Sequence, residues 1–169
     1  MPRISIVLPT YNEAGNIELL IDRTLQALGS YPGGVEVVVV DDDSPDKTWQ
    51  LVARKAAQDR RVRLIHRRGE SGLTSAISRG IHEALGEWVG WMDCDMSMPP
   101  EQWPQLADTL AGGGRSGHRL PLCTGGWGRG PLLYRPPLFP DHQPLGRPTP
   151  ELVDQRLYQR LYFGPPRGL

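Results

Sequence analysis

The stretch V-E-V-V-V-V-D-D-D-S-P-D, residues 35–46, is an almost continuous apolar run that ends abruptly in carboxylates. Such a run predicts a strand that is buried on both faces, as strands of a parallel sheet are. The stretch I-S-I-V-L-P-T-Y-N-E, residues 4–13, has the same pattern, with a strand expected over 4–8 and stopped by Pro9. Both stretches therefore place a polar loop directly after a buried strand.

Strands and helices alternate along the chain around these two stretches. Apolar runs predict further strands at 35–40, 62–65 and 88–92. Helical periodicity predicts helices at 13–28, at 71–85 and from about 99 to 110. Another helix is expected to end at about residue 57, with either Ser44 or Asp46 as its N-cap. This alternation predicts an α/β fold with a mostly parallel sheet and helices on both faces. Ligands of such sheets bind beyond the carboxyl ends of the strands, where the polar clusters at 11–13, 41–46 and 93–95 fall.

Composition argues against several classes of protein. The 169 residues carry no net charge and are 38% hydrophobic, which is untypical of nucleic-acid-binding or disordered acidic chains. The two cysteines, Cys94 and Cys123, have no framework spacing, which favours a reducing, intracellular compartment. We expect no signal peptide, because Met1-Pro2-Arg3 runs directly into a strand-like stretch, and no membrane span, because no apolar run reaches 18 residues.

The composition changes near Gly112. Residues 115–169 contain no Ala, Ile or Lys, but they hold ten of the chain's 17 prolines. Proline fixes φ and removes a backbone N–H, so we expect no helix and no central strand there. The sequence thus predicts an ordered domain over 1–111 and an irregular, disordered tail over 112–169.

The motif Asp93-Cys94-Asp95, at the end of the strand expected over 88–92, is the sharpest candidate site. Two carboxylates one residue apart can share a hard divalent cation, which in turn binds a diphosphate. The alternative is a pair of solvated loop carboxylates or a helix cap before Pro99. Taken alone, an Asp-x-Asp motif favours that alternative.

The run of three aspartates at residues 41–43 has three interpretations. One carboxylate could accept a base or ribose hydrogen bond, or the run could be the acidic pocket of a phospho-accepting receiver domain, or a capped loop. A receiver needs an acidic pair after the first strand and a lysine late in the fold. Glu13 supplies one acid, but the tail has no lysine.

Three other features are ambiguous when each is taken alone. Tyr11 could stack on a nucleobase, although Asn12 capping a plain strand-to-helix turn is the simpler interpretation. The basic loop Arg67-Arg68-Gly69 could meet a phosphate, although a solvated charge run is simpler. His66 and His82 lack the spacing of metal ligands, and we assign them no role.

Taken in order, these motifs resemble those of family-two glycosyltransferases of the GT-A fold, and within that family the dolichol-phosphate (polyprenyl-phosphate) mannosyltransferases. The matching stretches are I-V-L-P-T-Y-N-E, V-V-V-V-D-D-D-S-P-D, S-G-L-T-S-A and W-M-D-C-D-M-S-M-P-P-E. The resemblance covers about residues 3–111. It implies a Rossmann-like GT-A sheet that is truncated in this chain.

The resemblance implies site residues of three kinds. Those that line the nucleotide pocket are Pro9, Tyr11 and Glu13, and those that meet the base and ribose are Val40 and Asp42. Those that hold the sugar diphosphate are Asp93, Cys94 and Asp95, with Asp93 and Asp95 as catalytic residues and ligands of Mg²⁺ or Mn²⁺. Cys94 replaces the family's usual alanine, and Met96-Ser97-Met98 also departs from the family pattern, which leaves the sugar preference open.

The activity implied by the resemblance is the transfer of a hexose, with inversion, to a polyprenyl or dolichyl phosphate. The expected sugar source is GDP-mannose, and the expected location is peripheral, at the cytoplasmic face of a membrane. No nucleic-acid partner is expected. The alternatives are a glucosyl- or N-acetylhexosaminyltransferase of the same family, or a nucleotide-binding remnant without catalysis.

The tail, residues 112–169, is predicted to be translated in a shifted reading frame. Where the resembling family has a segment such as A-D-L-V-I-G-S-R-Y-V-P-G-G, this chain reads G-R-S-G-H-R-L-P-L-C-T-G-G over 114–126. Codons for 114–126 exist whose next frame spells A-D-L-V-I-G-S-R-Y-V-P-G, and the same offset can yield family-like peptides at 139–143 and 156–162. We therefore expect one extra G near codons 112–114 and a chain without transferase turnover. The alternative is a native linker rich in proline and glycine.

Overall fold

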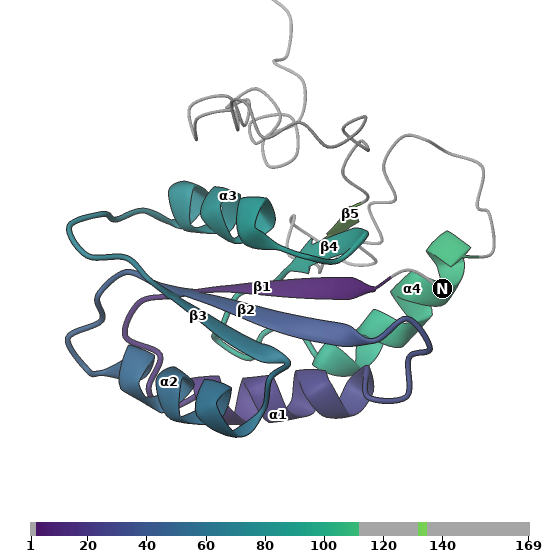
Figure 1. Cartoon of the computed structure of the whole chain (residues 1–169), viewed down its shortest axis with the longest axis horizontal. Helices are drawn as coiled ribbons and strands as arrows, with labels where there is room; N and C mark the ends of the chain where they lie inside the picture. The colour runs from purple at the N-terminus through teal and green to yellow at the C-terminus, as the bar shows by residue number, and fades with distance from the viewer. Residues whose placement is uncertain (1–2, 112–131, 135–169) are drawn as a thin grey trace, which may run out of the picture. The chain divides into compact units, whose positions relative to one another are not determined.

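The computed structural model describes residues 3–111 and 132–134, all of which belong to a compact unit spanning Met1–Pro136. A five-stranded sheet forms its centre, in the order β3-β2-β1-β4-β5 (Figure 1). The first four strands are mutually parallel, and β5 runs antiparallel to β4. The strands are β1 (Ile4–Thr10), β2 (Val35–Asp41), β3 (Val62–His66), β4 (Trp88–Trp91) and β5 (Leu132–Tyr134).

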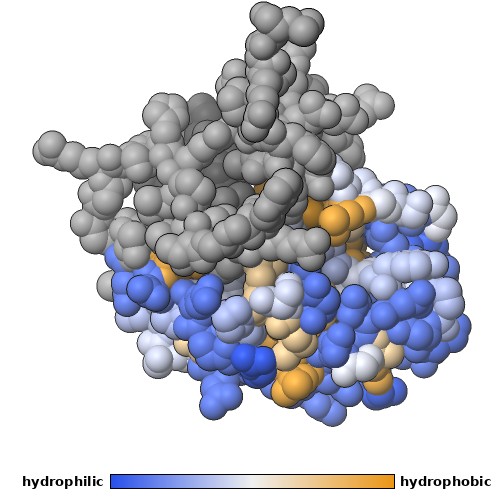
Figure 2. All heavy atoms as spheres, turned by 180° about the vertical axis from the view of Figure 1, so that it is seen from behind, coloured by the Kyte–Doolittle hydropathy of each residue, from blue (hydrophilic) through white to orange (hydrophobic). Residues whose placement is uncertain are grey.

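Helices cover both faces of this sheet. Figure 1 shows α1, α2 and α4 on one face and α3 on the other. Their bounds are α1 (Ile17–Ala27), α2 (Thr48–Gln58), α3 (Leu73–Glu83) and α4 (Trp103–Ala111), with a 3₁₀ turn η1 (Pro100–Gln102) leading into α4. None of the described helices is long and apolar enough to cross a membrane. The described surface seen from behind is mainly hydrophilic, with separate apolar spots (Figure 2).

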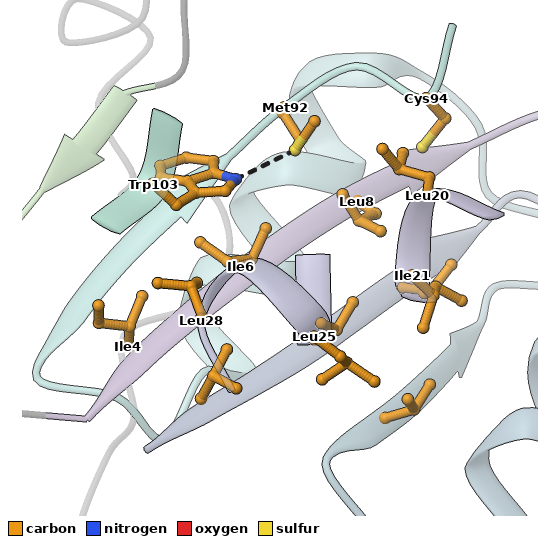
Figure 3. Close-up of a cluster of buried hydrophobic side chains, with 14 of the residues drawn as sticks. Ile4, Ile6, Leu8, Leu20, Ile21, Leu25, Leu28, Met92, Cys94 and Trp103 are labelled. Carbon is orange, nitrogen blue, oxygen red and sulfur yellow. Dashed lines mark hydrogen bonds between the residues drawn. The ribbon is translucent and has the colours of Figure 1, made fainter. Parts of the chain in front are cut away.

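The core lies on both faces of β1, because successive side chains of a strand point to opposite faces. Ile4, Ile6 and Leu8 belong to the larger cluster, which α1 and α4 complete, whereas Val7 belongs to a smaller cluster under α3. In the larger cluster the indole N–H of Trp103 donates to the Met92 sulfur at 3.3 Å (Figure 3). Burial on both faces explains why β1 and β2 read as continuous apolar runs.

The predicted α/β fold is confirmed, but β1 does not stop at Pro9. It continues to Thr10, because neighbouring β4 ends where Trp91 pairs with Val7. Beyond that point the missing N–H of Pro9 costs no ladder hydrogen bond. Helix α1 begins at Ile17 and not at residue 13, after a loop whose N–H groups are bound by another loop.

The expectation that 112–169 is irregular was wrong at residues 132–134. Leu132–Tyr134 forms a short antiparallel edge strand, and an edge strand needs hydrogen bonds on one side only. The remaining predictions for 112–169 lie outside the described residues.

Candidate functional site

The loops that follow β1, β2, β3 and β4 all leave the sheet at its carboxyl edge. They carry every residue that the sequence singled out for ligand binding, except Pro9, Val40 and Asp41, which lie near the carboxyl ends of strands β1 and β2. In an open parallel sheet this edge is where ligands bind. The geometry of each loop decides which side chains remain available.

Asp41 is a structural residue of this edge. Its side chain is fully buried and accepts hydrogen bonds from the Thr10 hydroxyl at 2.9 Å, the Ser44 hydroxyl at 2.7 Å and the Ser44 N–H at 2.9 Å. A buried carboxylate must be satisfied internally in this way. Asp41 therefore ties β1 to the loop after β2 and is closed to a ligand.

Asp42 is clamped by residues from the next crossover. Arg67 Nε donates to Asp42 Oδ1 at 2.7 Å, and the N–H of Gly72 donates to Oδ2 at 2.9 Å. Arg67 is only 4% exposed and also donates to the Ser75 hydroxyl at 3.0 Å. The interpretation of 67–69 as a solvated charge run was thus wrong for Arg67, although Arg68 is exposed.

Asp43 turns outward to a histidine that we had assigned no role. Its Oδ1 lies 2.6 Å from His66 Nε2, and the His66 ring stacks on Trp49 with centroids 4.5 Å apart. Asp43 adopts a φ of +54°, a left-handed backbone that non-glycine residues rarely take. Asp43, His66 and Trp49 therefore form one contact group beside the carboxyl ends of β2 and β3.

The loop after β1 presents one open aromatic ring. Tyr11 is 59% exposed, so its ring is accessible to a flat ligand such as a nucleobase. Glu13 accepts a hydrogen bond from Asn16 Nδ2 at 3.2 Å and keeps part of its side chain exposed. Pro9 and Val40 are buried, so neither offers an accessible surface to a ligand in this structure.

The segment Asp93-Cys94-Asp95 alternates between core and surface. Cys94 is buried and donates to the Pro9 carbonyl at 3.3 Å, whereas Asp93 and Asp95 are on the accessible side. Burial raises the pKa of the Cys94 thiol well above its usual value. Repulsion by four carboxylates raises this pKa further, namely those of Glu13, Asp93, Asp95 and Asp41.

These four carboxylates lie at one edge of the sheet, and a divalent cation bound there would neutralise part of their charge. Among residues 3–111 and 132–134, no three His, Cys, Asp or Glu side chains are arranged as a metal cluster. The assignment of Asp93 and Asp95 as cation ligands stays a prediction, and Asp95 Oδ1 accepts the Ser97 N–H at 2.9 Å in this structure. Cys94 faces the core and does not fit the role of a ligand.

Comparison with known proteins was made by sequence and by structure. Residues 5–162 match the profile "Glycosyl transferase family 2". Dolichol-phosphate mannosyltransferase of Pyrococcus furiosus is 43% identical over 114 residues, which are 66% of this chain and 31% of that protein. Undecaprenyl-phosphate 4-deoxy-4-formamido-L-arabinose transferase of Pectobacterium carotovorum is 33% identical over 111 residues, 65% of this chain and 34% of that protein. The chain thus spans about a third of the length of these relatives.

Solved structures show the same likeness. A mannosyltransferase from Pyrobaculum calidifontis in complex with GDP-Man and Mn²⁺ superposes with a TM-score of 0.52 and 33% identity, over 64% of this chain and 31% of that one. Glucosyl-3-phosphoglycerate synthase from Mycobacterium tuberculosis, in complex with Mn²⁺ and UDP, superposes with a TM-score of 0.52 and 26% identity. The match covers 64% of this chain and 39% of that one. Both of these proteins were solved with a nucleotide or nucleotide sugar and Mn²⁺.

Proposed function

The chain belongs to glycosyl transferase family 2, and from that premise we propose that it carries the nucleotide-sugar half of a transferase acting on a polyprenyl or dolichyl phosphate. The transferred sugar is a hexose, and GDP-mannose is the proposed source. Support comes from the dolichol-phosphate mannosyltransferases among the relatives and from the mannosyltransferase solved with GDP-Man.

One observation carries this proposal: Glu13, Asp41, Asp93 and Asp95 all lie at or just beyond the carboxyl ends of the adjacent parallel strands β2, β1 and β4. Asp41 is closed by internal hydrogen bonds, which leaves three acids from two loops. A nucleotide diphosphate is itself negative, so a bound cation should strengthen its binding at this edge. The edge therefore suits a nucleotide sugar bound as its Mg²⁺ or Mn²⁺ complex.

Each residue then has a distinct role in the proposal. Tyr11 stacks on the base, and Glu13 and Asp42 accept hydrogen bonds from the nucleoside. Asp93 and Asp95 hold the cation, which when bound stabilises the charge of the departing diphosphate.

The acceptor supplies the nucleophile. A lipid phosphate is already ionised near neutral pH, so attack with inversion at the sugar carbon needs alignment more than a general base. The lipid acceptor would place the enzyme at the cytoplasmic face of a membrane as a peripheral protein. This location follows from the proposed acceptor.

A second candidate is a uridine-linked sugar. It is favoured by the synthase solved with UDP. Met96-Ser97-Met98, which departs from the pattern of the resembling mannosyltransferases, leaves this choice to experiment.

Calorimetric titration of the full chain tests both candidates. We expect weak binding of GDP-mannose that Mn²⁺ strengthens about tenfold, corresponding to about 1.4 kcal/mol. Asp95→Asn should abolish the gain from Mn²⁺ and leave metal-free affinity nearly unchanged, because it removes a cation ligand and no base contact. Asp22→Asn, an acid on α1 paired with Lys55, is the matched control and should behave like the wild type.

Competition with UDP-glucose and UDP-N-acetylglucosamine decides between the two candidates. Preference for a uridine nucleotide would replace GDP-mannose by the second candidate. Absence of binding by every nucleotide sugar, with and without Mn²⁺, would overturn the proposed function.

A further inference from the structure

Three consecutive backbone N–H groups in the first loop (residues 11–16, between β1 and α1) are bound by side chains from the second loop (residues 42–47, between β2 and α2) and the first residue of α2. Each hydrogen bond is 3.0 Å long. They join the N–H of Asn12 to Ser44 Oγ, that of Glu13 to Thr48 Oγ1 and that of Ala14 to Asp46 Oδ2. A loop that is held at three consecutive N–H groups by a neighbouring segment cannot move independently of that segment.

Asp46 is the centre of this clamp. Its Oδ1 accepts from the Thr48 hydroxyl at 2.6 Å and from the Thr48 N–H at 3.0 Å, while Oδ2 accepts from Ala14. The Thr48 hydroxyl therefore donates to Asp46 and accepts from Glu13, which links three residues in one chain of hydrogen bonds. Thr48 is fully buried, so water cannot easily replace its hydroxyl.

The sequence predicted Ser44 or Asp46 as the N-cap of α2, but neither of them occupies the N-cap position. The residue that precedes the helix is Lys47, with a left-handed φ of +66°, and no cap hydrogen bond comes from its side chain. Asn12, in the first loop, also has a positive φ of +61°. Backbone in this region persists where surrounding contacts hold it, and here those contacts are the cross-loop hydrogen bonds.

The two clamped loops carry the residues proposed to meet the nucleoside. Tyr11 and Glu13 lie in the first loop, and Asp42 opens the second. Asp42 is separately anchored by Arg67 and Gly72, so the second loop is the fixed side. The first loop has to be positioned against it.

We propose that Asp46 and Thr48 are positioning residues of the nucleotide-sugar site, which hold Tyr11 and Glu13 at a fixed place opposite Asp42 without touching the nucleotide. The inference deepens the proposed function and rests on it, because the ligand whose affinity depends on the clamp is the nucleotide sugar.

The test compares two variants with two matched controls. Asp46→Asn is matched by Asp59→Asn, because Asp59 lies at the other end of α2 and also accepts the N–H two residues on, that of Arg61, at 2.9 Å. Thr48→Val is matched by Thr24→Val, because Thr24 is equally buried and its hydroxyl donates to the Leu20 carbonyl at 2.8 Å. Neither control residue contacts the two loops through these hydrogen bonds.

Two measurements are made on the full chain, below its melting temperature. Amide hydrogen exchange should become faster at residues 13 and 14 in Asp46→Asn and Thr48→Val, and stay unchanged in the controls. Affinity for GMP and for GDP-mannose should fall by the same factor, about five- to tenfold, the effect expected from one or two hydrogen bonds. The ratio of affinities with and without Mn²⁺ should not change, because the cation ligands are in another loop.

The outcomes separate this inference from the proposed function. Faster exchange at residues 13 and 14 with wild-type nucleotide affinity would overturn the positioning role, and unchanged exchange would overturn the clamp itself. An equal loss of nucleotide affinity in the control variants Asp59→Asn or Thr24→Val would show that general destabilisation causes the loss. That result would also overturn the positioning role. A wild-type chain that binds no nucleotide would overturn the proposed function, and the positioning role with it.

Discussion

Asp41, Asp42 and Asp43 are adjacent in the chain, yet their carboxylates meet three different sets of partners at the sheet edge. Asp41 is held by Thr10 and Ser44, Asp42 by Arg67 and Gly72, and Asp43 by His66. Side chains alternate at the end of a strand, which separates charges that would otherwise repel. At the residue scale, then, the run is one structural acid, one anchored candidate for nucleoside binding and one acid that contacts His66.

The Asp59–Arg61 pair yields a prediction about pH. The Arg61 guanidinium holds the pKa of the Asp59 carboxyl below its ordinary value of 3.8. Because the folded-state pKa is the lower one, the pair stabilises the fold above pH 3.8 and loses this effect as pH falls through the folded-state value. Asp59→Asn should therefore lower the unfolding free energy at pH 7 by about 0.2–1 kcal/mol.

Urea denaturation at pH 7, 5 and 3 checks this expectation. The difference between wild type and Asp59→Asn should be constant from pH 7 to 5 and shrink at pH 3. A difference that is as large at pH 3 as at pH 7 would show that the ionised carboxylate is not its source.

At the scale of elements, α3 packs unusually closely on β1 and β2. A Cβ atom added at Gly80 would lie 2.3 Å from Val7 Cγ1 and 3.1 Å from Val40 Cγ2. Glycine thus lets the helix backbone approach the sheet, although glycine is otherwise unfavourable inside a helix. The close approach also keeps the α3 start, with Gly72, within reach of Asp42.

Gly80→Ala should destabilise the protein by about 1–3 kcal/mol, since overpacking outweighs the gain in helix propensity. Thermal unfolding, monitored by circular dichroism, measures this loss of stability. Gly15→Ala is the control, because nothing lies within 4 Å of a Cβ at that position, and it should be neutral or slightly stabilising. Stabilisation by Gly80→Ala would mean that α3 moves away from Val7 at little cost.

At the scale of the whole molecule, the carboxyl ends and the amino ends of the parallel strands have different roles. The carboxyl edge carries the candidate site, whereas the opposite edge is closed by fully buried Glu36. Glu36 accepts hydrogen bonds from the Ser5 hydroxyl and the Leu85 N–H, both at 2.5 Å, and pairs with Arg63 at 3.4 Å. The unit therefore fixes its α3–β4 connection far from the proposed chemistry.

We propose that this chain contains a nucleotide-sugar half whose continuation is encoded in the next reading frame, and we expect it to show no transferase turnover. The measurement is transfer from radiolabelled GDP-mannose to dolichyl phosphate in detergent micelles with Mn²⁺. Deleting one G in codons 112–114 should produce turnover, because the family-like segments after residue 112 are then translated.

Two results would contradict this expectation. One is robust transfer by the purified 169-residue chain. The other is DNA resequencing that finds an unaltered G run together with a frame-restored protein that is no more active. The native proline- and glycine-rich linker would then be the better account of the tail.

The alternation of strands and helices can be predicted from the amino-acid sequence, because apolar runs of strand length and helical periodicity are local properties. The sequence also determined which loops are polar, and the order of its motifs pointed to the family. It could not assign partners: Arg67 lies 25 residues from Asp42, and Ser44 and Thr48 lie 32 and 35 residues from the N–H groups that they bind. Only the tertiary structure decided these contacts, because strand pairing and not chain neighbourhood brings the loops together at one edge. The burial of Arg67, the closure of Asp41 and the clamp centred on Asp46 all follow from that pairing.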